Sequence, residues 1–126
     1  RDLYTLAMSN DFYCDCVLSG QVPVSIVAET FRVLAFEHTA PTWQIHIVVI
    51  PKKHVQRLID VEDSSLFAEI FEVMNKIIQE RGFAESNYKI ITNGGSYQTT
   101  QHLHFHLVSG APLNPSNSAQ SGEMSV

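Results

Sequence analysis

The chain has 126 residues, of which 44% are hydrophobic and 17% are charged, and its formal net charge is -5. This size and composition predict one globular domain with a single hydrophobic core. The negative charge argues against nucleic acid or an acidic membrane surface as the main partner, so any phosphate must be held by local backbone, hydroxyl and imidazole groups. The longest apolar run, at residues 47–50, is far shorter than the roughly 20 residues that a spanning helix needs.

Two further features bear on location. Cys14 and Cys16 are too few and too close together for a disulfide framework, which favours a reducing, cytoplasmic setting. No signal-peptide pattern opens the chain, but it begins with Arg1 rather than Met, so the sequence leaves open a removed leader.

The first half of the chain reads as one short helix and three strands. Residues 11–18 suggest a helix with Asp11 as its N-cap, and Ser19 and Gly20 stop it. Residues 24–29 and 31–36 predict a hairpin with a tight turn at Glu29 and Thr30, and residues 37–42 predict a loop. The run 44–50 is apolar on both faces, which is typical of a central strand.

The second half predicts one long helix and two strands. Apolar residues at three- and four-residue spacing indicate a helix over about 63–81, capped by Asp63 or Ser64 and ended by Gly82. Strands are expected at 88–92 and 101–108, separated by a polar loop. The predicted fold class is therefore α+β, with about five mainly antiparallel strands, one long helix and one short helix. We expect one domain over residues 1–110 and a flexible C-terminal tail over residues 111–126, which shows no periodicity.

Three histidines alternate with apolar residues in the last predicted strand. This spacing puts His102, His104 and His106 on one face and Leu103 with Phe105 on the other. A neutral histidine can act as a nucleophile towards phosphorus while its neighbours share the proton transfers. Three imidazoles can also bind a catalytic metal, or can simply be a polar solvent face.

The metal alternative is the weaker one. No carboxylate lies near the triad in the sequence, and Cys14 and Cys16 lack the two-residue spacer typical of structural zinc pairs. We therefore predict no metal and no cofactor.

Three sequence blocks carry a family resemblance. The pattern from His102 to Val108 resembles the signature of the histidine triad (HIT) superfamily of nucleotide hydrolases and transferases. The stretch from Phe36 to His54 is similar to a second block of that family, and residues 93–99 are similar to a third. The resemblance covers about residues 12–110. It is closer to the Hint branch, which acts on purine nucleoside 5′-phosphoramidates, than to the Fhit branch of dinucleoside polyphosphate hydrolases.

The resemblance implies roles for individual residues. His104 would be the nucleophile that forms a covalent nucleotidyl-histidine intermediate, His102 would orient it, His106 would contact the phosphate and leaving group, and His46 would complete the cluster. The positions that match phosphate- or leaving-group-binding residues are Asn93, Gly95, Gln98 and Thr99. The positions that match the walls of an apolar slot for the base are Tyr13, Cys14, Val17, Phe36 and Val48.

One position departs from the family pattern. His38, preceded by Glu37, stands where the family usually has an aspartate that accepts hydrogen bonds from the ribose hydroxyls. A neutral histidine offers one acceptor nitrogen, whereas a carboxylate accepts from both hydroxyls. Either Glu37 replaces the acceptor or the substrate is not an ordinary ribonucleotide.

The expected function is a metal-independent hydrolase or transferase that cleaves a P–N or P–O bond at a purine nucleoside 5′-phosphate. The rivals are a dinucleoside polyphosphate hydrolase and a nucleotide-binding protein with weak or lost catalysis. The resemblance implies a homodimer; the expected ligand is a purine nucleotide or nucleotide conjugate, with neither nucleic acid nor membrane as a partner.

Overall fold

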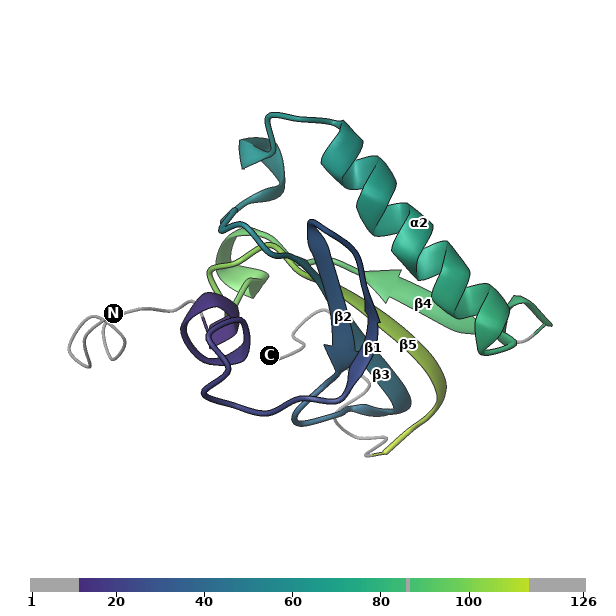
Figure 1. Ribbon diagram of the computed structural model, residues 1–126. Coiled ribbons are helices and arrows are strands. Elements are labelled where there is room, and N and C mark those ends of the chain that lie inside the picture. Colours follow the sequence, from purple (N-terminus) through teal and green to yellow (C-terminus); the bar gives the residue numbers. More distant parts are fainter. Residues whose placement is uncertain (1–11, 86, 114–126) are drawn as a thin grey trace.

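The computed structural model describes residues 12–85 and 87–113 and contains one five-stranded antiparallel sheet (Figure 1). The order of the strands across the sheet is β1-β2-β3-β5-β4, so β3 is central, as its two apolar faces predict. The strands are β1 (Ile26–Glu29), β2 (Val33–Glu37), β3 (Trp43–Pro51), β4 (Tyr88–Ile91) and β5 (Phe105–Pro112). The α+β prediction is confirmed. No helix in the described ranges is long and apolar enough to cross a membrane.

The predicted hairpin of β1 and β2 is confirmed, but its turn lies later in the chain. The backbone N–H of Thr30 donates to the carbonyl of Val33, so Phe31 belongs to the turn and not to the second strand. At the other end, Glu37 is the last residue of β2 rather than part of the loop. The first strand ends at Glu29 as predicted, but both strands begin two residues later than predicted and the second ends one residue later.

One helix, α2 (Ser65–Glu80), covers one face of the sheet and confirms the predicted long helix (Figure 1). Its N-cap is Ser64, whose side chain makes no capping bond; Asp63, one residue earlier, accepts the backbone N–H of Ser65. Gly82 follows the end of the helix with a φ of 77° that suits glycine. The buried side of the helix consists of Ile70, Val73, Met74, Ile77 and Ile78. These residues form the main core with inward-facing residues of β2, β3 and β5.

Truncating this core is expected to destabilise the fold without touching the opposite face of the sheet. Met74 is fully buried, so Met74→Ala should lower the free energy of unfolding by roughly 2–5 kcal/mol through lost burial and a cavity. The neighbouring Asn75→Ala, on the exposed side of α2, should change it by less than about 0.5 kcal/mol. Urea unfolding at neutral pH measures both variants. Equal stabilities would contradict this core assignment.

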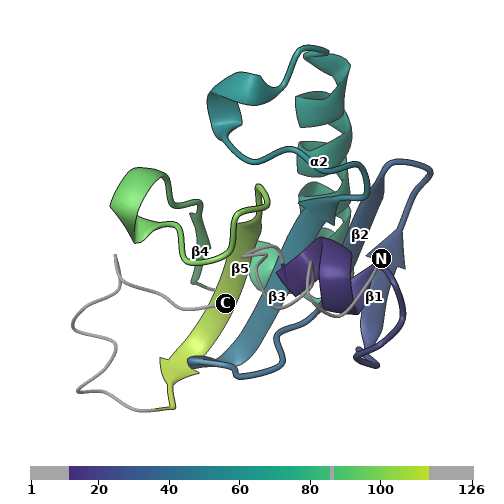
Figure 2. The same cartoon turned by 90° about the vertical axis from the view of Figure 1, so that its left-hand side faces the viewer.

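The other face of the sheet carries a short helical segment, η1 (Tyr13–Val17), as Figure 2 shows. The backbone N–H of Leu18 donates to the carbonyl of Tyr13 over 2.7 Å, a five-residue step that makes this segment a π-helical turn rather than an α-helix. It stands where the sequence predicts a helix over residues 11–18. The expected cap, Asp11, lies outside the described residues.

The last strand differs most from its prediction. It was expected over residues 101–108, but β5 begins at Phe105 and continues to Pro112, which pairs with Trp43. Residues 101–104 precede the strand and lead the chain into the sheet. Gly110 allows this extension, because its φ is 85° and a Cβ there would lie 2.5 Å from Oε1 of Gln44. The remainder of the expected tail, residues 114–126, lies outside the described residues.

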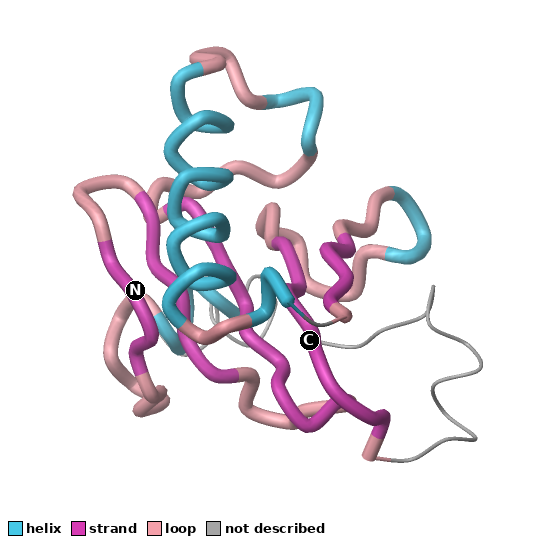
Figure 3. The backbone as a smooth tube through the Cα atoms, turned by 90° about the vertical axis from the view of Figure 1, so that its right-hand side faces the viewer, coloured by secondary structure: helices cyan, strands magenta, loops and turns pink. Residues whose placement is uncertain are grey.

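Two long connections meet beyond one end of the sheet (Figure 3). The first follows β3 and carries the 3-10 turn η2 (Leu58–Asp60), and the second precedes β5 and carries η4 (Gly95–Tyr97). Residues of both line one hollow. The second connection carries His102 and His104 at its end, directly before β5.

Candidate active site

The three triad histidines and His46 lie together on the sheet face that η1 covers. Each of these four residues is at most 2% exposed. The ring centroids of His104 and His106 are 5.0 Å apart, and those of His46 and His106 are also 5.0 Å apart. The intervening Leu103, Phe105 and Leu107 pack in the core beneath α2. The two faces expected from the alternation are thus both present.

The His104 ring has a defined tautomer. Its Nδ1 lies 2.7 Å from the backbone carbonyl of His102, and since a carbonyl only accepts, Nδ1 carries the proton. The neutral ring therefore keeps its lone pair on Nε2. The Thr92 hydroxyl donates to the backbone carbonyl of His104 over 2.8 Å and steadies this residue from the end of β4. This arrangement puts the proton of the neutral ring on Nδ1 and its lone pair on Nε2.

A hydrogen-bond relay defines the tautomer of His106. The backbone N–H of Thr42 donates to Nδ1 of His46 over 3.0 Å, so the proton of neutral His46 lies on Nε2. That nitrogen donates to Nδ1 of His106 over 2.9 Å, which puts the His106 proton on Nε2. The His106 Nε2 is buried and has no hydrogen-bond partner among the described residues. A buried N–H of this kind is suited to a bound acceptor atom.

Burial keeps both relay histidines neutral. Desolvation, with the charge of His38 second, lowers the pKa of His46 to about 3. Desolvation, followed by the charges of His104, His46 and His38, lowers the pKa of His106 to about 2. At neutral pH the site therefore offers uncharged donors.

These lowered pKa values predict acid sensitivity of the fold. In the unfolded chain these histidines have a pKa of about 6.5 and bind protons below that pH, whereas His46 and His106 in the folded protein stay neutral. Their contribution to the free energy of unfolding is therefore fully present above pH 6.5 and is lost as the pH decreases towards 3. Each histidine should lower the free energy of unfolding by up to roughly 1.4 kcal/mol for every pH unit in that window. Urea unfolding at pH 7, 6 and 5 measures the slope. His46→Gln should reduce it, and an unchanged slope would show that His46 titrates normally.

His102 faces a second group of possible ligands. Its Nε2–H donates to the carbonyl of Pro51 over 2.7 Å, so its Nδ1 lone pair points towards Cys14 Sγ at 3.2 Å. His54 Nδ1 lies 3.8 Å from the same sulfur. Ligand atoms of Cys14, His54 and His102 all lie within 4.8 Å of one another, and a thiolate with two imidazoles suits zinc. His54, which the sequence interpretation placed outside the site, thus belongs beside it.

The three histidines His38, His46 and His106 also lie within 4.8 Å of one another. Their hydrogen bonds fit a metal less well. Nδ1 of His38 accepts from the N–H of Ala40, and Nδ1 of His46 accepts from Thr42, so in both neutral rings Nε2 carries a proton. The Nδ1 lone pair of His106 already accepts from His46. A metal here would have to displace these bonds.

The expected base slot is an apolar cluster packed between η1 and the sheet. Tyr13, Val17, Phe36 and Val48 are each at most 6% exposed and contact one another in one buried group. The Tyr13 ring lies edge-on to His104 at 5.0 Å. The structure thus brings four of the five predicted wall residues together beside His104, whereas Cys14 lies against His102.

The expected phosphate-binding loop lines a hollow of about 300 Å³, and none of the histidines of the site is part of that lining. Asn93, Gly95 and Gln98 line it together with η2 residues, whereas Thr99 is exposed and is not part of its lining. The Gln98 amide donates to the carbonyl of Gln56 over 2.7 Å, which joins the two connections. Nδ2 of Asn93 is buried and has no hydrogen-bond partner in the described part of the chain.

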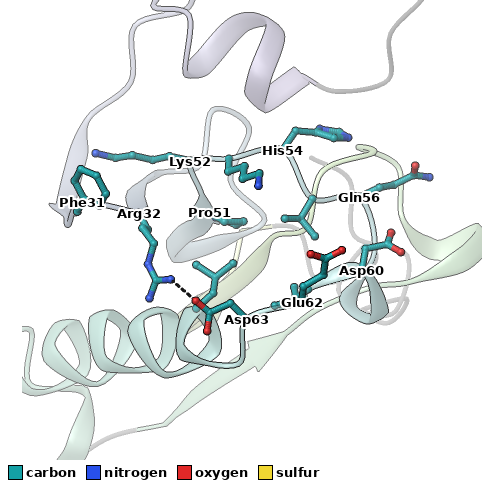
Figure 4. Close-up of a pocket in the computed structure, with 13 residues that line it drawn as sticks. Phe31, Arg32, Pro51, Lys52, His54, Gln56, Asp60, Glu62 and Asp63 are labelled. Carbon is teal, nitrogen blue, oxygen red and sulfur yellow. Dashed lines mark hydrogen bonds and ion pairs between the residues drawn. The ribbon is translucent and has the colours of Figure 1, made fainter.

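A larger groove of about 830 Å³ runs between the end of β3 and the start of α2 (Figure 4). Lys52 and His54 are on one side, Glu62 and Asp63 on the other, and an Arg32–Asp63 ion pair of 3.2 Å closes one end. His54 is the only residue of the two possible metal clusters that lines this groove. The groove therefore adjoins the histidine site at His54.

A HIT domain model matches residues 19–113. The chain belongs to the HIT family. The solved structure of a histidine triad protein from Clostridium difficile is 38% identical in sequence, with a TM-score of 0.73. The match covers 83% of this chain and 94% of that protein's chain. An adenosine 5′-monophosphoramidase of Schizosaccharomyces pombe is 34% identical, over 73% of this chain and 68% of the relative. A purine nucleoside phosphoramidase of Escherichia coli is 31% identical, over 79% and 87% respectively.

Sequence reasoning missed those functional features that depend on the backbone. The Thr42 N–H, the Pro51 carbonyl and the Ala40 N–H each set a histidine tautomer, and no side-chain pattern reveals them. His54 had a signal, since it closes the Phe36–His54 block of the HIT family resemblance. Thr92 had none beyond its place before Asn93.

Proposed function

We propose that this HIT protein is a cytoplasmic hydrolase or transferase that cleaves a P–N bond, or a P–O bond, at a purine nucleoside 5′-phosphate. The observation that carries the proposal is a pair of neighbouring rings 5.0 Å apart: His104, with its lone pair on Nε2, and His106, with a buried Nε2–H. The relatives from S. pombe and E. coli, whose names describe phosphoramidases, support this reaction class.

The chemistry follows from these two atoms. Nε2 of His104 attacks phosphorus as the bond to the leaving atom breaks, giving a nucleotidyl-histidine, while Nδ1–H continues to donate to the carbonyl of His102. His106 donates to a phosphate oxygen or to the leaving atom. The His106 Nε2–H stabilises the charge that develops on the leaving atom, and the proton that the leaving group finally takes comes from solvent, because Nδ1 of His106 already accepts from His46. Water then cleaves the intermediate and releases the nucleoside monophosphate.

Two substrates test this proposal against its rivals. Incubation with an adenosine 5′-phosphoramidate and, separately, with a dinucleoside polyphosphate is followed by chromatography of the products. Release of AMP from the first substrate supports the phosphoramidase. Release from the second alone indicates the dinucleoside polyphosphate hydrolase. Tight binding without release indicates a nucleotide-binding protein that has lost catalysis.

Removal of metal is expected to leave this reaction intact. The proposed step needs only His104 and His106, whereas a metal at Cys14, His54 and His102 would lie on the other side of His102. Dialysis against a chelator, with metal content measured before and after, should leave kcat within about twofold, since no reacting atom is a ligand. Loss of turnover that zinc restores would favour metal-dependent chemistry.

We also propose that the protein is a homodimer joined through the β4 edge or α2. Among the described strands, β4 pairs only with β5, so its other edge has no partner. Tyr88 and Ile90 of β4 are 44% and 37% exposed, and Phe71 of α2 is 43% exposed, so both elements offer apolar side chains to a partner. Sedimentation equilibrium measures the mass. A dimer that Ile90→Lys converts to a monomer supports this edge.

A further inference from the structure

The ring of His102 makes a contact at each of its two nitrogens. It is fully buried, and its Nε2 lies 2.7 Å from the carbonyl of Pro51. Since a carbonyl only accepts, Nε2 carries a proton, and Nδ1 faces Sγ of Cys14 at 3.2 Å. One proton therefore lies between the sulfur and this nitrogen, whichever of the two atoms holds it. Cys14 thus supplies a partner for a ring nitrogen that solvent does not reach.

The orientation of His102 matters to the proposed nucleophile. Nδ1 of His104 donates to the backbone carbonyl of His102 over 2.7 Å, and this bond keeps the lone pair of the neutral His104 ring on Nε2. Both residues precede β5, so the strand ladder does not hold them. The His102 N–H donates to the carbonyl of Thr100 over 2.8 Å, and the side chain of His102 is held by its ring contacts. A ring that turns can therefore take its own carbonyl out of line.

The turn η1 places two consecutive side chains against the triad. The Tyr13 ring lies edge-on to His102 at 6.0 Å and to His104 at 5.0 Å, so it holds both by shape. Cys14, the next residue, makes the directional contact to the His102 ring. Cys16 is half-buried like Cys14, but no hydrogen bond joins its side chain to a histidine in the part of the chain that the structure describes. The same turn thus contains a matched control thiol.

We propose that Cys14 is a positioning residue of the active site: its contact with Nδ1 fixes the His102 ring and, through the His102 carbonyl, the proton on Nδ1 of His104. The inference rests on the proposed function, and it gives Cys14 a role other than a wall of the base slot. A wall residue changes how tightly the base is held, and so KM, whereas lost alignment of the nucleophile lowers kcat. The two roles therefore predict different kinetics.

The decisive experiment compares alanine with serine at position 14, using hydrolysis of an adenosine 5′-phosphoramidate. Cys14→Ala removes the contact, so kcat should fall roughly three- to tenfold, which is the worth of one net hydrogen bond, while KM stays within about twofold. Cys14→Ser keeps a donor on a side chain of the same shape and should recover at least about half of the lost rate. A change in KM with kcat unchanged would show that Cys14 is only a wall of the slot.

The same two substitutions at Cys16 are the control. Cys16→Ala and Cys16→Ser alter η1 two residues away, and each should keep kcat within about twofold. A general loosening of the turn would lower the activity of both alanine variants alike and would contradict the positioning role. Urea unfolding of all four variants verifies that the fold is kept.

Bound zinc would give Cys14 a different role, and serine separates the two. Cys14, His54 and His102 have ligand atoms within 4.8 Å of one another, and serine is not among the usual ligands of zinc. A metal role therefore predicts equal losses of activity in Cys14→Ser and Cys14→Ala, together with loss of zinc from the purified protein. Elemental analysis of the wild-type protein and both variants measures this, and that combined result would overturn the inference.

Long-range ¹H–¹⁵N spectra test the contact without any substrate. The Nδ1 resonance of His102 should move in Cys14→Ala, and it should move less in Cys14→Ser and in Cys16→Ala. The Nδ1 proton of His104 should exchange faster with water in Cys14→Ala than in the wild-type protein. These shifts in a protein that hydrolyses no phosphoramidate would refute only the proposed function. Unchanged His102 and His104 resonances in a folded Cys14→Ala protein would refute the positioning role itself.

Discussion

Replacing His104 by asparagine is expected to abolish turnover of an adenosine 5′-phosphoramidate, with kcat falling by at least about 10³-fold. The substitution removes the Nε2 atom that would bond to phosphorus. An asparagine can still donate to the carbonyl of His102, as Nδ1–H does now over 2.7 Å, so the approach to β5 should keep its conformation. Single-turnover kinetics measures the loss.

Mass spectrometry of acid-free quenched samples gives a second readout for this prediction. The wild-type protein should carry a nucleotidyl adduct on the peptide that contains His104, and the variant should carry none. The control is Asn75→Ala on the exposed side of α2, which should retain kcat within about twofold because it touches neither the site nor the core. Ordinary turnover by a folded His104→Asn protein would exclude His104 as the nucleophile.

The second large effect is expected at His46, which acts through His106. His46→Ala removes the donor to Nδ1 of His106 and leaves the Thr42 N–H without its acceptor. The His106 proton is then no longer confined to Nε2, so kcat should fall by roughly 10²-fold while KM changes little. His46→Gln should recover part of the loss, because its amide can accept from Thr42 and donate to His106.

A variant from the other face of the sheet controls for lost stability. Met74→Ala is expected to destabilise the protein to a similar or greater degree, yet it lies in the α2 core and should keep kcat per folded molecule. Long-range ¹H–¹⁵N spectra report the His106 tautomer directly. If His46→Ala and Met74→Ala lose activity equally, or if the His106 proton stays on Nε2 in His46→Ala, His46 has only a structural role.

Local periodicity is a good guide to this fold where one face is buried. The helix α2 and the central position of β3 follow from apolar spacing, because burial against the sheet selects the same residues that the pattern marks. The pattern fails at β5, whose strand ladder starts at Phe105 rather than Gln101 and continues to Pro112. Which residues pair depends on where β3 and β4 lie, and no local propensity encodes that.

In the candidate site, too, some features follow from the sequence and others depend on tertiary packing. The alternation of His102, His104 and His106 assigns them to one face, and the family blocks single out His46, so the sequence alone determined which histidines meet. It did not determine that Cys14 and His54 would lie beside His102. These contacts join residues 40 or more positions apart, and only the packing of η1 and of the chain after Pro51 against the triad creates them.

The triad residues were thus determined by the sequence, because a strand period of two assigns side chains to faces without reference to the rest of the chain. Their chemical states were decided by the tertiary structure. The Ala40 N–H makes His38 a donor, the Thr42 N–H sets the relay to His106, and the Pro51 carbonyl sets His102. Tautomer and pKa depend on backbone groups and burial supplied by distant segments, which residue types alone do not specify.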